Sequence, residues 1–449
     1  MTTVGDTLWA GDAAALERDH IIDARYPLSG ASAWLPHGYA LCSAVLDRFR
    51  DTFAAAGYEE LGLPSAVPLA AMERQAGSLK DFLDRIYLLC PTPSGPRHAL
   101  ASTMEAQISG IMARWLEYGR RPPFRVTTVR TVGRHERNGM RPLWKERFVW
   151  PFFEAQAATE GPAHEDIELM TTGPMLACDS MALPTIAVER MRDPDTPAAY
   201  ADRRLELVTL LPDGSTTVLT SVYALGTRFS EMFGVEIGGR PLDMVNFAFS
   251  ARLVLALLVH AHDGPHPVYH PSVAPVQVAL VPERRESAAA ALALAAGLRG
   301  SGVRARVFDN PKGMAVRTEE AGTHGAPLLC TVGGTALLNG RPLPGDGVRA
   351  LVDALSVTGT RMAEDRRRRH DAGVTEAGSL GDALAAGAAG GIVRMPLCDA
   401  APCSRQVLGT SLDVIGRPWR DTGTPAPCGC CGAPARVPVL LGTKFRGDK

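Results

Sequence analysis

The sequence predicts an α+β protein in which an antiparallel sheet flanked by helices is followed by a small α/β unit and a cysteine-rich end. Three observations predict this class. Residues 1 to about 265 mix helical and strand periods without a regular strand–helix alternation, which favours an antiparallel sheet. A strand–helix–strand pattern begins at about Val276. Five of the nine cysteines lie between Cys398 and Cys431. A chain of 449 residues fits two or three such units.

The first part of the chain begins with a helix and an extended segment. Residues 38–57, GYALCSAVLDRFRDTFAAAG, place apolar side chains at helical spacing and end at Gly57, which predicts an amphipathic helix with a glycine stop. Residues 59–69, EELGLPSAVPL, follow directly. Because Pro64 and Pro68 would break a central strand, we expect an extended element at a sheet edge.

Apolar segments continue to the end of this part. Residues 124–132 and 148–153 are typical of buried strands, and a polar loop separates them. Residues 253–262, LVLALLVHAH, predict either a helix or a buried strand. The segment 263–275 is rich enough in proline to be a linker.

The second part predicts a compact α/β unit. Residues 276–282 and 303–309 are expected to be strands on either side of a helix in 284–302, and 326–334 form another strand. A further helix and a charged connector are expected in 341–374. The run of four arginines in this connector is more often a solvated helix face than a binding site.

Composition limits the class of function. The apolar share of 46% is typical of soluble globular proteins, and a net charge of −1 excludes a globally basic surface that coats nucleic acid. No run of about 20 apolar residues occurs, and the N-terminus lacks a basic and then apolar signal layout, so we expect a cytoplasmic protein without membrane contact. The isolated cysteines are expected in the core: Cys42, Cys90, Cys178 and Cys330.

The polar loop RHERNGMRPLWKER, residues 134–147, lies between the two expected strands. If the strand continued into it, Arg134 and Glu136 would project from one face, where a cation and an acceptor can address two parts of one ligand. A phosphate and an amino-bearing heterocycle would suit them. The alternative is a surface ion pair, which is common and weak.

Two further positions carry candidate binding groups. Thr103 and Glu105 in STMEAQ place a hydroxyl and a carboxylate two residues apart, which suits an ammonium group, although the same pattern also marks a helix start. Arg252 is a lone cation in the apolar run NFAFSARLVLALLVH. It requires an anionic partner or a cleft, or else it places its head at the rim of the core.

The cysteine-rich end predicts a tetrahedral thiolate site of the kind that holds structural zinc. The favoured ligands are Cys398, Cys403, Cys428 and Cys431, and Cys430 is an alternative to Cys428. Closed sites of four thiolates stabilise a fold and do not catalyse, so we expect a structural role.

Taken in order, these segments resemble a known family. The segments are YPLSGASAWLPHGYAL, GYEELGLPSAVP, STME, RHERNGMRPLWKER, SVYALGTRFSEMF, FAFSAR and CCGAPARVPVLLGTKF. Together they are similar to prolyl-tRNA synthetase of the archaeal and eukaryotic type, a class II aminoacyl-tRNA synthetase. The resemblance implies a class II catalytic domain in 1–268, an anticodon-binding-like domain in 272–365 and a zinc-binding domain in 370–449.

The resemblance also implies roles for individual residues. Arg134 would bind the α-phosphate of ATP, Glu136 the adenine amino group and Arg252 the γ-phosphate, while Arg147 would face the nucleotide from the returning strand. Thr103 and Glu105 would hold the imino group of proline, and Glu154 would lie in the same pocket. Pro64 would lie at a homodimer interface. ATP and Mg²⁺ are the implied substrate and ion, and Zn²⁺ is implied at the cysteine site.

Several positions depart from the family pattern. The amino acid pocket would contain Tyr223 and Gln156 where the family has histidine, and Phe247 where it has tryptophan. Val218 replaces a glutamine that contacts nucleotide or metal, and Phe148 replaces a glutamate. Exchanges of this kind in a small pocket alter the discrimination between substrates by about a few kcal/mol.

The segment HGAPLLCTVGGTALL, residues 324–338, lacks the acidic and basic groups that the family places near an anticodon. The sequence is therefore consistent with three functions. The first activates proline, or a similar small amino acid, as its adenylate and transfers it to tRNA. The second transfers it to a carrier protein or a small molecule, and the third is a binding protein without catalysis.

Overall fold

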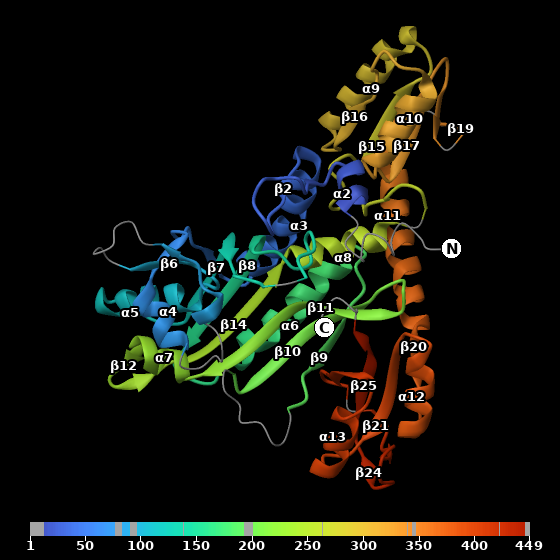
Figure 1. The fold of residues 1–449 in the computed structure, drawn as a ribbon. Coiled ribbons are helices and arrows are strands. Elements are labelled where there is room, and N and C mark those ends of the chain that lie inside the picture. Colours follow the sequence, from blue (N-terminus) through green and yellow to red (C-terminus); the bar gives the residue numbers. More distant parts are fainter. Residues whose placement is uncertain are drawn as a thin grey trace.

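The structure, a computed structural model, describes residues 13–76, 83–89, 97–137, 139–192, 201–262, 264–338, 340–343, 347–421 and 423–444. A large twisted sheet forms its centre (Figure 1). The eleven strands follow the order β20-β21-β25-β22-β9-β10-β11-β14-β8-β7-β3. Their bounds are β3 Glu59–Glu60, β7 Phe124–Gly133, β8 Phe148–Thr159, β9 Ile186–Glu189, β10 Arg203–Leu210, β11 Ser215–Gly226, β14 Asp243–Ser250, β20 Val374–Glu376, β21 Ile392–Leu397, β22 Asp413–Pro418 and β25 Val437–Lys444.

Helices cover this sheet unequally. One face packs against α3 (Pro36–Ala55), α6 (His164–Asp179) and α8 (Ala251–Ala261), and their apolar side chains form the largest core with the alternate residues of β8, β11 and β14. The other face carries α5 (Glu105–Glu117) and α7 (Arg228–Phe233) toward one end of the strands. The rest of that face stays open to a cavity.

The predicted segments of this part form as expected. The helix α3 begins at Pro36, where a missing N–H costs nothing, and it ends shortly before Gly57, whose φ of +82° favours glycine. The apolar run after Ser250 is a helix, α8, and not a strand. Three of the isolated cysteines, Cys42, Cys178 and Cys330, are buried, and Cys90 lies outside the described residues.

The remaining elements of this part are short. They are α2 Ala13–Arg18, β1 Ile22–Asp23, β2 Ala33–Trp34, β4 Ala66–Pro68, α4 Leu69–Ala76, η1 Leu83–Arg85, β5 Leu88–Leu89, β6 His98–Leu100, β12 Glu236–Ile237 and β13 Arg240–Pro241.

The small α/β unit has the expected strand–helix–strand order. Its sheet has five strands in the order β16-β15-β17-β18-β19. Helices α9, α10 and α11 pack on this sheet (Figure 1). The bounds are β15 Val278–Pro282, η2 Arg285–Ser287, α9 Ala288–Gly300, β16 Ala305–Val307, α10 Met314–Thr323, β17 Leu328–Val332, β18 Ala336–Leu338, β19 Arg341–Pro342 and α11 Gly347–Ala372.

The C-terminal part does not stand apart from the large sheet. The long helix α11 leads to it from the small α/β unit (Figure 1). Strand β22 pairs with β9 through Arg417 and Glu189, and β25 runs parallel to the start of β11. The sheet of the first part and the strands of the last part therefore share one hydrogen-bonded surface. The other elements here are α12 Leu380–Ala388, α13 Ala401–Leu408, β23 Ala426–Pro427 and β24 Pro434–Ala435.

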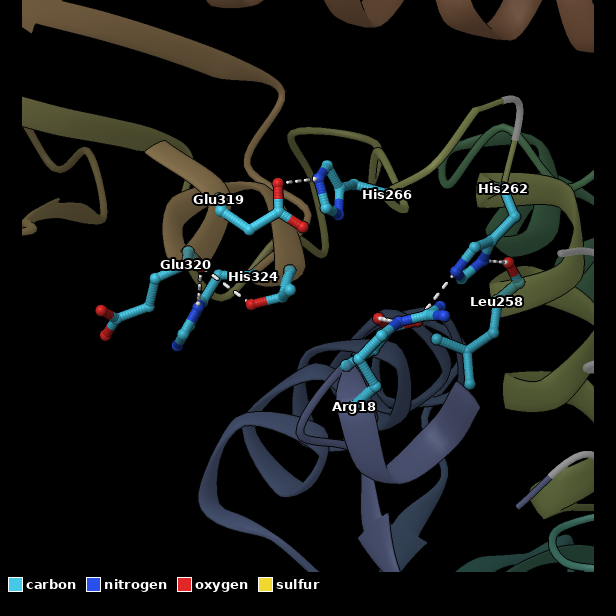
Figure 2. A network of polar contacts seen from close by, with 9 residues as sticks. Arg18, Leu258, His262, His266, Glu319, Glu320 and His324 are labelled. Carbon is cyan, nitrogen blue, oxygen red and sulfur yellow. Dashed lines mark hydrogen bonds and ion pairs between the residues drawn. The ribbon is translucent and has the colours of Figure 1, made fainter. Parts of the chain in front are cut away.

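Polar contacts join α2, α8 and the small α/β unit (Figure 2). The buried side chain of His262 lies 2.8 Å from the Leu258 carbonyl through Nδ1 and 2.8 Å from an Asp19 carboxylate oxygen through Nε2. His266 Nε2 lies 3.1 Å from a Glu319 carboxylate oxygen on α10. Among the described residues, none of the helices has the length and the apolar character that crossing a membrane requires.

Candidate active site

A cavity of about 1930 Å³ opens on the uncovered face of the large sheet. This volume exceeds the roughly 300–1,000 Å³ of an ordinary small-molecule site, so it has room for more than one ligand. Six of the predicted site residues line it: Thr103, Glu105, Arg134, Glu136, Tyr223 and Arg252. The structure thus brings together side chains that lie up to 149 positions apart, from residue 103 to residue 252.

Arg134 and Glu136 lie just beyond the end of β7, which stops at Gly133. The expectation that both residues sit on a strand is therefore wrong, because the backbone turns here and Glu136 N–H donates to the Arg134 carbonyl. Both side chains nevertheless reach the cavity. Arg134 Nε donates to the Ser102 carbonyl at 2.9 Å, and its guanidinium lies 4.9 Å from the centre of the Phe152 ring. These contacts hold the cation in place before any anion binds.

Thr103 and Glu105 lie at the start of α5, where the two side chains are hydrogen-bonded to each other. Glu154 on β8 contacts the same segment. Its carboxylate accepts hydrogen bonds from Met104 N–H at 2.9 Å and from Asn246 Nδ2 at 2.8 Å. Complete burial, followed by the nearby charge of Glu105, raises the pKa of Glu154 well above its usual range. A carboxyl pair of this kind favours a cationic ligand group beside Thr103.

Arg252 lies in the first turn of α8, and the Ser250 hydroxyl accepts a hydrogen bond from its backbone N–H at 3.4 Å. Its guanidinium stacks 3.8 Å from the centre of the Trp144 ring, and Nη2 donates to the Trp144 carbonyl at 3.4 Å. Cation–π stacking and the start of a helix orient this cation toward the cavity. Arg134 and Arg252 together give the site its capacity for a polyanionic ligand.

Arg147, which belongs to the predicted ATP-binding set, makes contacts within the loop and with the segment before it. It is not among the residues that line the cavity. Its Nε donates to the Glu136 carbonyl at 2.8 Å and its Nη1 donates to the Ser29 hydroxyl at 3.0 Å. The guanidinium therefore ties the loop to the segment around Gly30, against which its stem packs. In this structure Arg147 therefore fixes the conformation of the loop.

Three residues predicted to contact the amino acid also lie outside the cavity lining. Phe247 is buried in the opposite core, 5.2 Å from the Phe53 ring, because side chains alternate along β14 and Asn246 and Ala248 take the cavity face. Gln156 is fully buried, and its amide donates to the Ser109 hydroxyl at 3.0 Å. Glu154 is also fully buried, so both side chains lie beneath the residues that line the cavity.

Two of the departures from the family pattern do line the cavity. Tyr223 lies on β11, where Arg204 stacks 5.3 Å from the centre of its ring. Val218 lies on the same strand and adds an apolar surface without an oxygen that could hold a metal. Phe148 instead stacks on Tyr87, with ring centres 5.1 Å apart.

Sequence reasoning missed three polar groups of the site. Asn246 and Gln75 hold Glu154 and Glu105, and Gln75 Nε2 lies 3.4 Å from Glu105. Asn246 could have been noticed as the only amide in the apolar run MVNFAF. Glu146, in the loop of residues 134–147, is buried and accepts from the Ser32 hydroxyl at 2.6 Å. Burial raises its pKa to about 7, against the lowering effect of this hydrogen bond.

We expect Glu146→Gln to change how stability depends on pH. Because the pKa of Glu146 is higher in the folded protein than its ordinary value of 4.5, its contribution to the free energy of unfolding falls as the pH rises from 4.5 to about 7. The difference corresponds to about 3 kcal/mol. The melting temperature of the variant, relative to wild type, should therefore rise between about pH 5 and about pH 8. Glu236→Gln on exposed β12 is the control. A pH-independent difference in both variants would contradict the assignment.

The predicted metal ligands form one cluster. The sulfur atoms of Cys398, Cys403, Cys428 and Cys431 all lie within 4.8 Å of one another. Cys398 sits after β21, Cys403 sits in α13, and the other two belong to the turn between β23 and β24. Cys430 is outside this group, so the geometry favours Cys428 over Cys430. Four convergent thiols fit a tetrahedral metal ion.

Comparisons with known proteins find prolyl-tRNA synthetases. No family model matches the chain. The proline–tRNA ligase of Methanopyrus kandleri is 26% identical over 469 residues, which cover 96% of this chain and 95% of that relative. The structure of Giardia lamblia prolyl-tRNA synthetase with prolyl-adenylate matches with a TM-score of 0.85 at 19% identity, covering 99% of both chains. Cryptosporidium parvum prolyl-tRNA synthetase with L-proline and AMP matches with 0.84 at 16% identity, covering 99% of this chain and 96% of that one. The predicted α+β class and the resemblance to these synthetases are confirmed.

Proposed function

We propose that this chain is an ATP-dependent ligase that activates proline as prolyl-adenylate and transfers it to tRNA, with release of pyrophosphate and then AMP. The observation that carries this proposal is that one cavity is lined by Thr103 and Glu105 and also by Arg134 and Arg252. The hydroxyl and the carboxylate suit an imino or ammonium group, and the two guanidinium groups suit phosphates. Similarity to proline–tRNA ligases over nearly the whole chain supports the same reaction.

The chain's own residues would act by positioning and by charge. Thr103 and Glu105 hold the imino nitrogen so that the amino acid carboxylate points toward Arg134. A carboxylate oxygen attacks the α-phosphorus, a bond from phosphorus to oxygen forms, and the bond to the bridging oxygen of pyrophosphate breaks. Arg134 and Arg252 offset the negative charge on the phosphates. No general base is needed, because this carboxylate is already ionised at neutral pH.

The remaining nucleotide contacts follow from the same geometry. Glu136 lies 3.6 Å from Lys145 Nζ and 3.9 Å from an Arg85 guanidinium nitrogen, which hold its carboxylate at the cavity wall. From there it can accept a hydrogen bond from the adenine amino group. Mg²⁺ would enter with ATP and neutralise its phosphates. Since Val218 offers no oxygen, phosphate oxygens and water would supply most of its ligands.

The side chains that line the cavity determine which amino acid fits. Tyr223 and Ala248 lie on neighbouring strands and line it. Tyr223 replaces an imidazole of the family pattern, and Ala248 adds a methyl group to the wall. A small amino acid similar to proline is therefore the alternative substrate. Each such exchange is worth about 1–3 kcal/mol of discrimination.

The acceptor has a second candidate. The turn after β17 consists of Gly333, Gly334 and Thr335 and carries no charged side chain. Recognition of RNA requires polar groups for the base edges and cations for the phosphates. This observation favours transfer to a carrier protein or a small molecule. Similarity to tRNA ligases favours tRNA, which remains the first candidate. A cytoplasmic homodimer is part of the proposal. Pro64, which is exposed, would lie at its interface.

The proposal predicts proline-dependent exchange of labelled pyrophosphate into ATP. Each of the common amino acids is tested separately, and the reaction without amino acid is the control. Exchange with proline, followed by charging of total tRNA, would be the full expected result. Robust exchange without charging would favour the second acceptor. No exchange with any common or proline-like amino acid would contradict activation and leave the binding protein.

Zinc is proposed at the cluster of Cys398, Cys403, Cys428 and Cys431. Each residue supplies one thiolate, and a site with four protein ligands has no open position for catalysis. The ion would hold α13, the β23–β24 turn and the end of β21 together. Through β21 and β22 this cluster is connected to the sheet that carries the active-site cavity.

A further inference from the structure

Two carboxyl groups, those of Glu105 and Glu154, lie around the single hydroxyl of Thr103. Thr103 Oγ1 donates to a Glu105 carboxylate oxygen, and it lies 3.5 Å from Glu154 Oε1. A threonine hydroxyl has one hydrogen, so it can donate to only one of the two groups. The other carboxyl group must therefore face a lone pair of Oγ1 or bring a hydrogen of its own.

The surroundings of Glu154 do not compensate a negative charge. Its side chain is 0% exposed, and its neighbours across the sheet, Thr128 on β7 and Ala248 on β14, are uncharged. The groups that donate to its carboxyl, Met104 N–H and Asn246 Nδ2, are neutral. Among the residues that the structure describes, no basic side chain forms an ion pair or a hydrogen bond with it. Burial of a carboxylate without a cation is costly, which favours the neutral acid.

Glu105 has the more favourable place for an ionised group. It lines the active-site cavity, where water and a ligand can reach it, and it accepts from Thr103 and from Gln75 Nε2, which lies at 3.4 Å. When two carboxyl groups share a site, one of them keeps its proton well above the usual pH. The difference in burial assigns this proton to Glu154.

The pKa of Glu154 is shifted in the direction that this assignment requires. Burial raises it most, and the negative charge of Glu105 raises it further. A hydrogen bond between the two carboxyl groups acts in the same direction. The two hydrogen bonds that Glu154 accepts from neutral donors oppose the shift without cancelling it.

We propose that Glu154 holds a proton in the free protein at neutral pH and acts as a positioning residue for the amino acid. Its O–H points toward Thr103 Oγ1, and Thr103 in turn donates to an ionised Glu105. The pair then carries one negative charge, which matches a ligand with a single protonated nitrogen. The protonation of Glu154 does not depend on the proposed activation of proline, whereas its effect on amino acid binding rests on that proposed function.

Infrared spectroscopy at about pH 8 tests the proton directly, because a neutral carboxylic acid has a C=O stretching band that ionised carboxylates lack. The wild-type protein is expected to show this acid band, and Glu154→Gln should lose it. Glu146→Gln is the control, since burial raises the pKa of Glu146 to about 7 and leaves that carboxyl mostly ionised at the pH of the measurement. The control should keep the band.

The KM for proline in pyrophosphate exchange tests the positioning. Glu154→Leu cannot donate a hydrogen bond and is expected to raise this KM about tenfold or more. Glu154→Gln is neutral and keeps an N–H donor, so it should recover most of this loss. Glu105→Gln removes the charge itself and should raise the KM about 10²-fold. The KM for ATP should change little in the Glu154 variants, whereas a general loss of structure would raise both values.

The outcomes separate this proposal from the proposed function. An unchanged acid band in Glu154→Gln would overturn it. So would a larger rise in the KM for proline in Glu154→Gln than in Glu105→Gln, because the charge would then reside on Glu154. If Glu154→Gln does not fold, the spectrum of Glu146→Gln still decides, since absence of the acid band there leaves Glu154 ionised. If no amino acid supports exchange, the proposed function fails and the infrared band still tests the proton.

Discussion

Replacing Arg252 by alanine is expected to lower the rate of proline-dependent pyrophosphate exchange by about 10²- to 10³-fold. This is the effect of removing one preorganised group that stabilises charge in a transition state. Arg252 stacks on Trp144 at 3.8 Å and lines the same cavity as Arg134. Its removal leaves the phosphates of ATP without one of the two fixed cations. Arg252→Lys should recover only part of the rate, because an ammonium group lacks the planar fork.

The control for this change is Arg240→Ala, which removes an exposed arginine on β13, outside the cavity. Circular dichroism and the melting temperature should show that Arg252→Ala keeps the fold. Wild-type exchange by a folded Arg252→Ala protein would contradict the role of this residue. A loss of exchange in Arg240→Ala as well would show that the assay does not report on the cavity.

Replacing Cys428 by serine is expected to remove the metal and to loosen the C-terminal part of the chain. Freshly purified, reduced wild-type protein should contain about one zinc per chain, since four sulfur atoms lie within 4.8 Å of one another. Structural zinc contributes about 10–16 kcal/mol of apparent binding free energy in isolated zinc-finger peptides. Its loss should raise amide hydrogen exchange in β21, β22 and β25, which metal analysis and mass spectrometry would measure together.

Cys430→Ser is the matched control for zinc binding, because Cys430 lies in the same turn but outside the cluster. It should keep the zinc and the protection of the strands. Zinc loss in Cys430→Ser with retention in Cys428→Ser would reverse the ligand assignment. Absence of zinc from wild-type protein would exclude the site.

Much of the fold could be predicted because it depends on local patterns. The helix over residues 36–55 follows from apolar side chains at helical spacing and from Gly57. Strands β7 and β8 follow from their apolar, β-prone sequences on either side of a polar loop. The joining of β22 to β9 could not be predicted, because pairing between residues more than 200 positions apart leaves no periodic signal.

The candidate site was predicted in part for the same reason. Charged groups such as Arg134 and Arg252 stand out in apolar surroundings, and the structure places both in the cavity. Arg147 and Phe247 were assigned by motif, but a side chain's direction depends on where a strand ends and which face it presents. Gly133 ends β7 before the loop, and the alternation along β14 turns Phe247 into the opposite core.

The sequence by itself determined the chemical groups available: two arginines in apolar surroundings, a hydroxyl and a carboxylate two residues apart, and a group of thiols. Residue types and local periods are properties of the chain, so they can be read without coordinates. Only the tertiary structure decided which of these groups meet. It placed Asn246 of β14 within hydrogen-bonding distance of Glu154 on β8, although 92 positions separate the two residues. Such contacts depend on long-range packing, which determines both burial and direction.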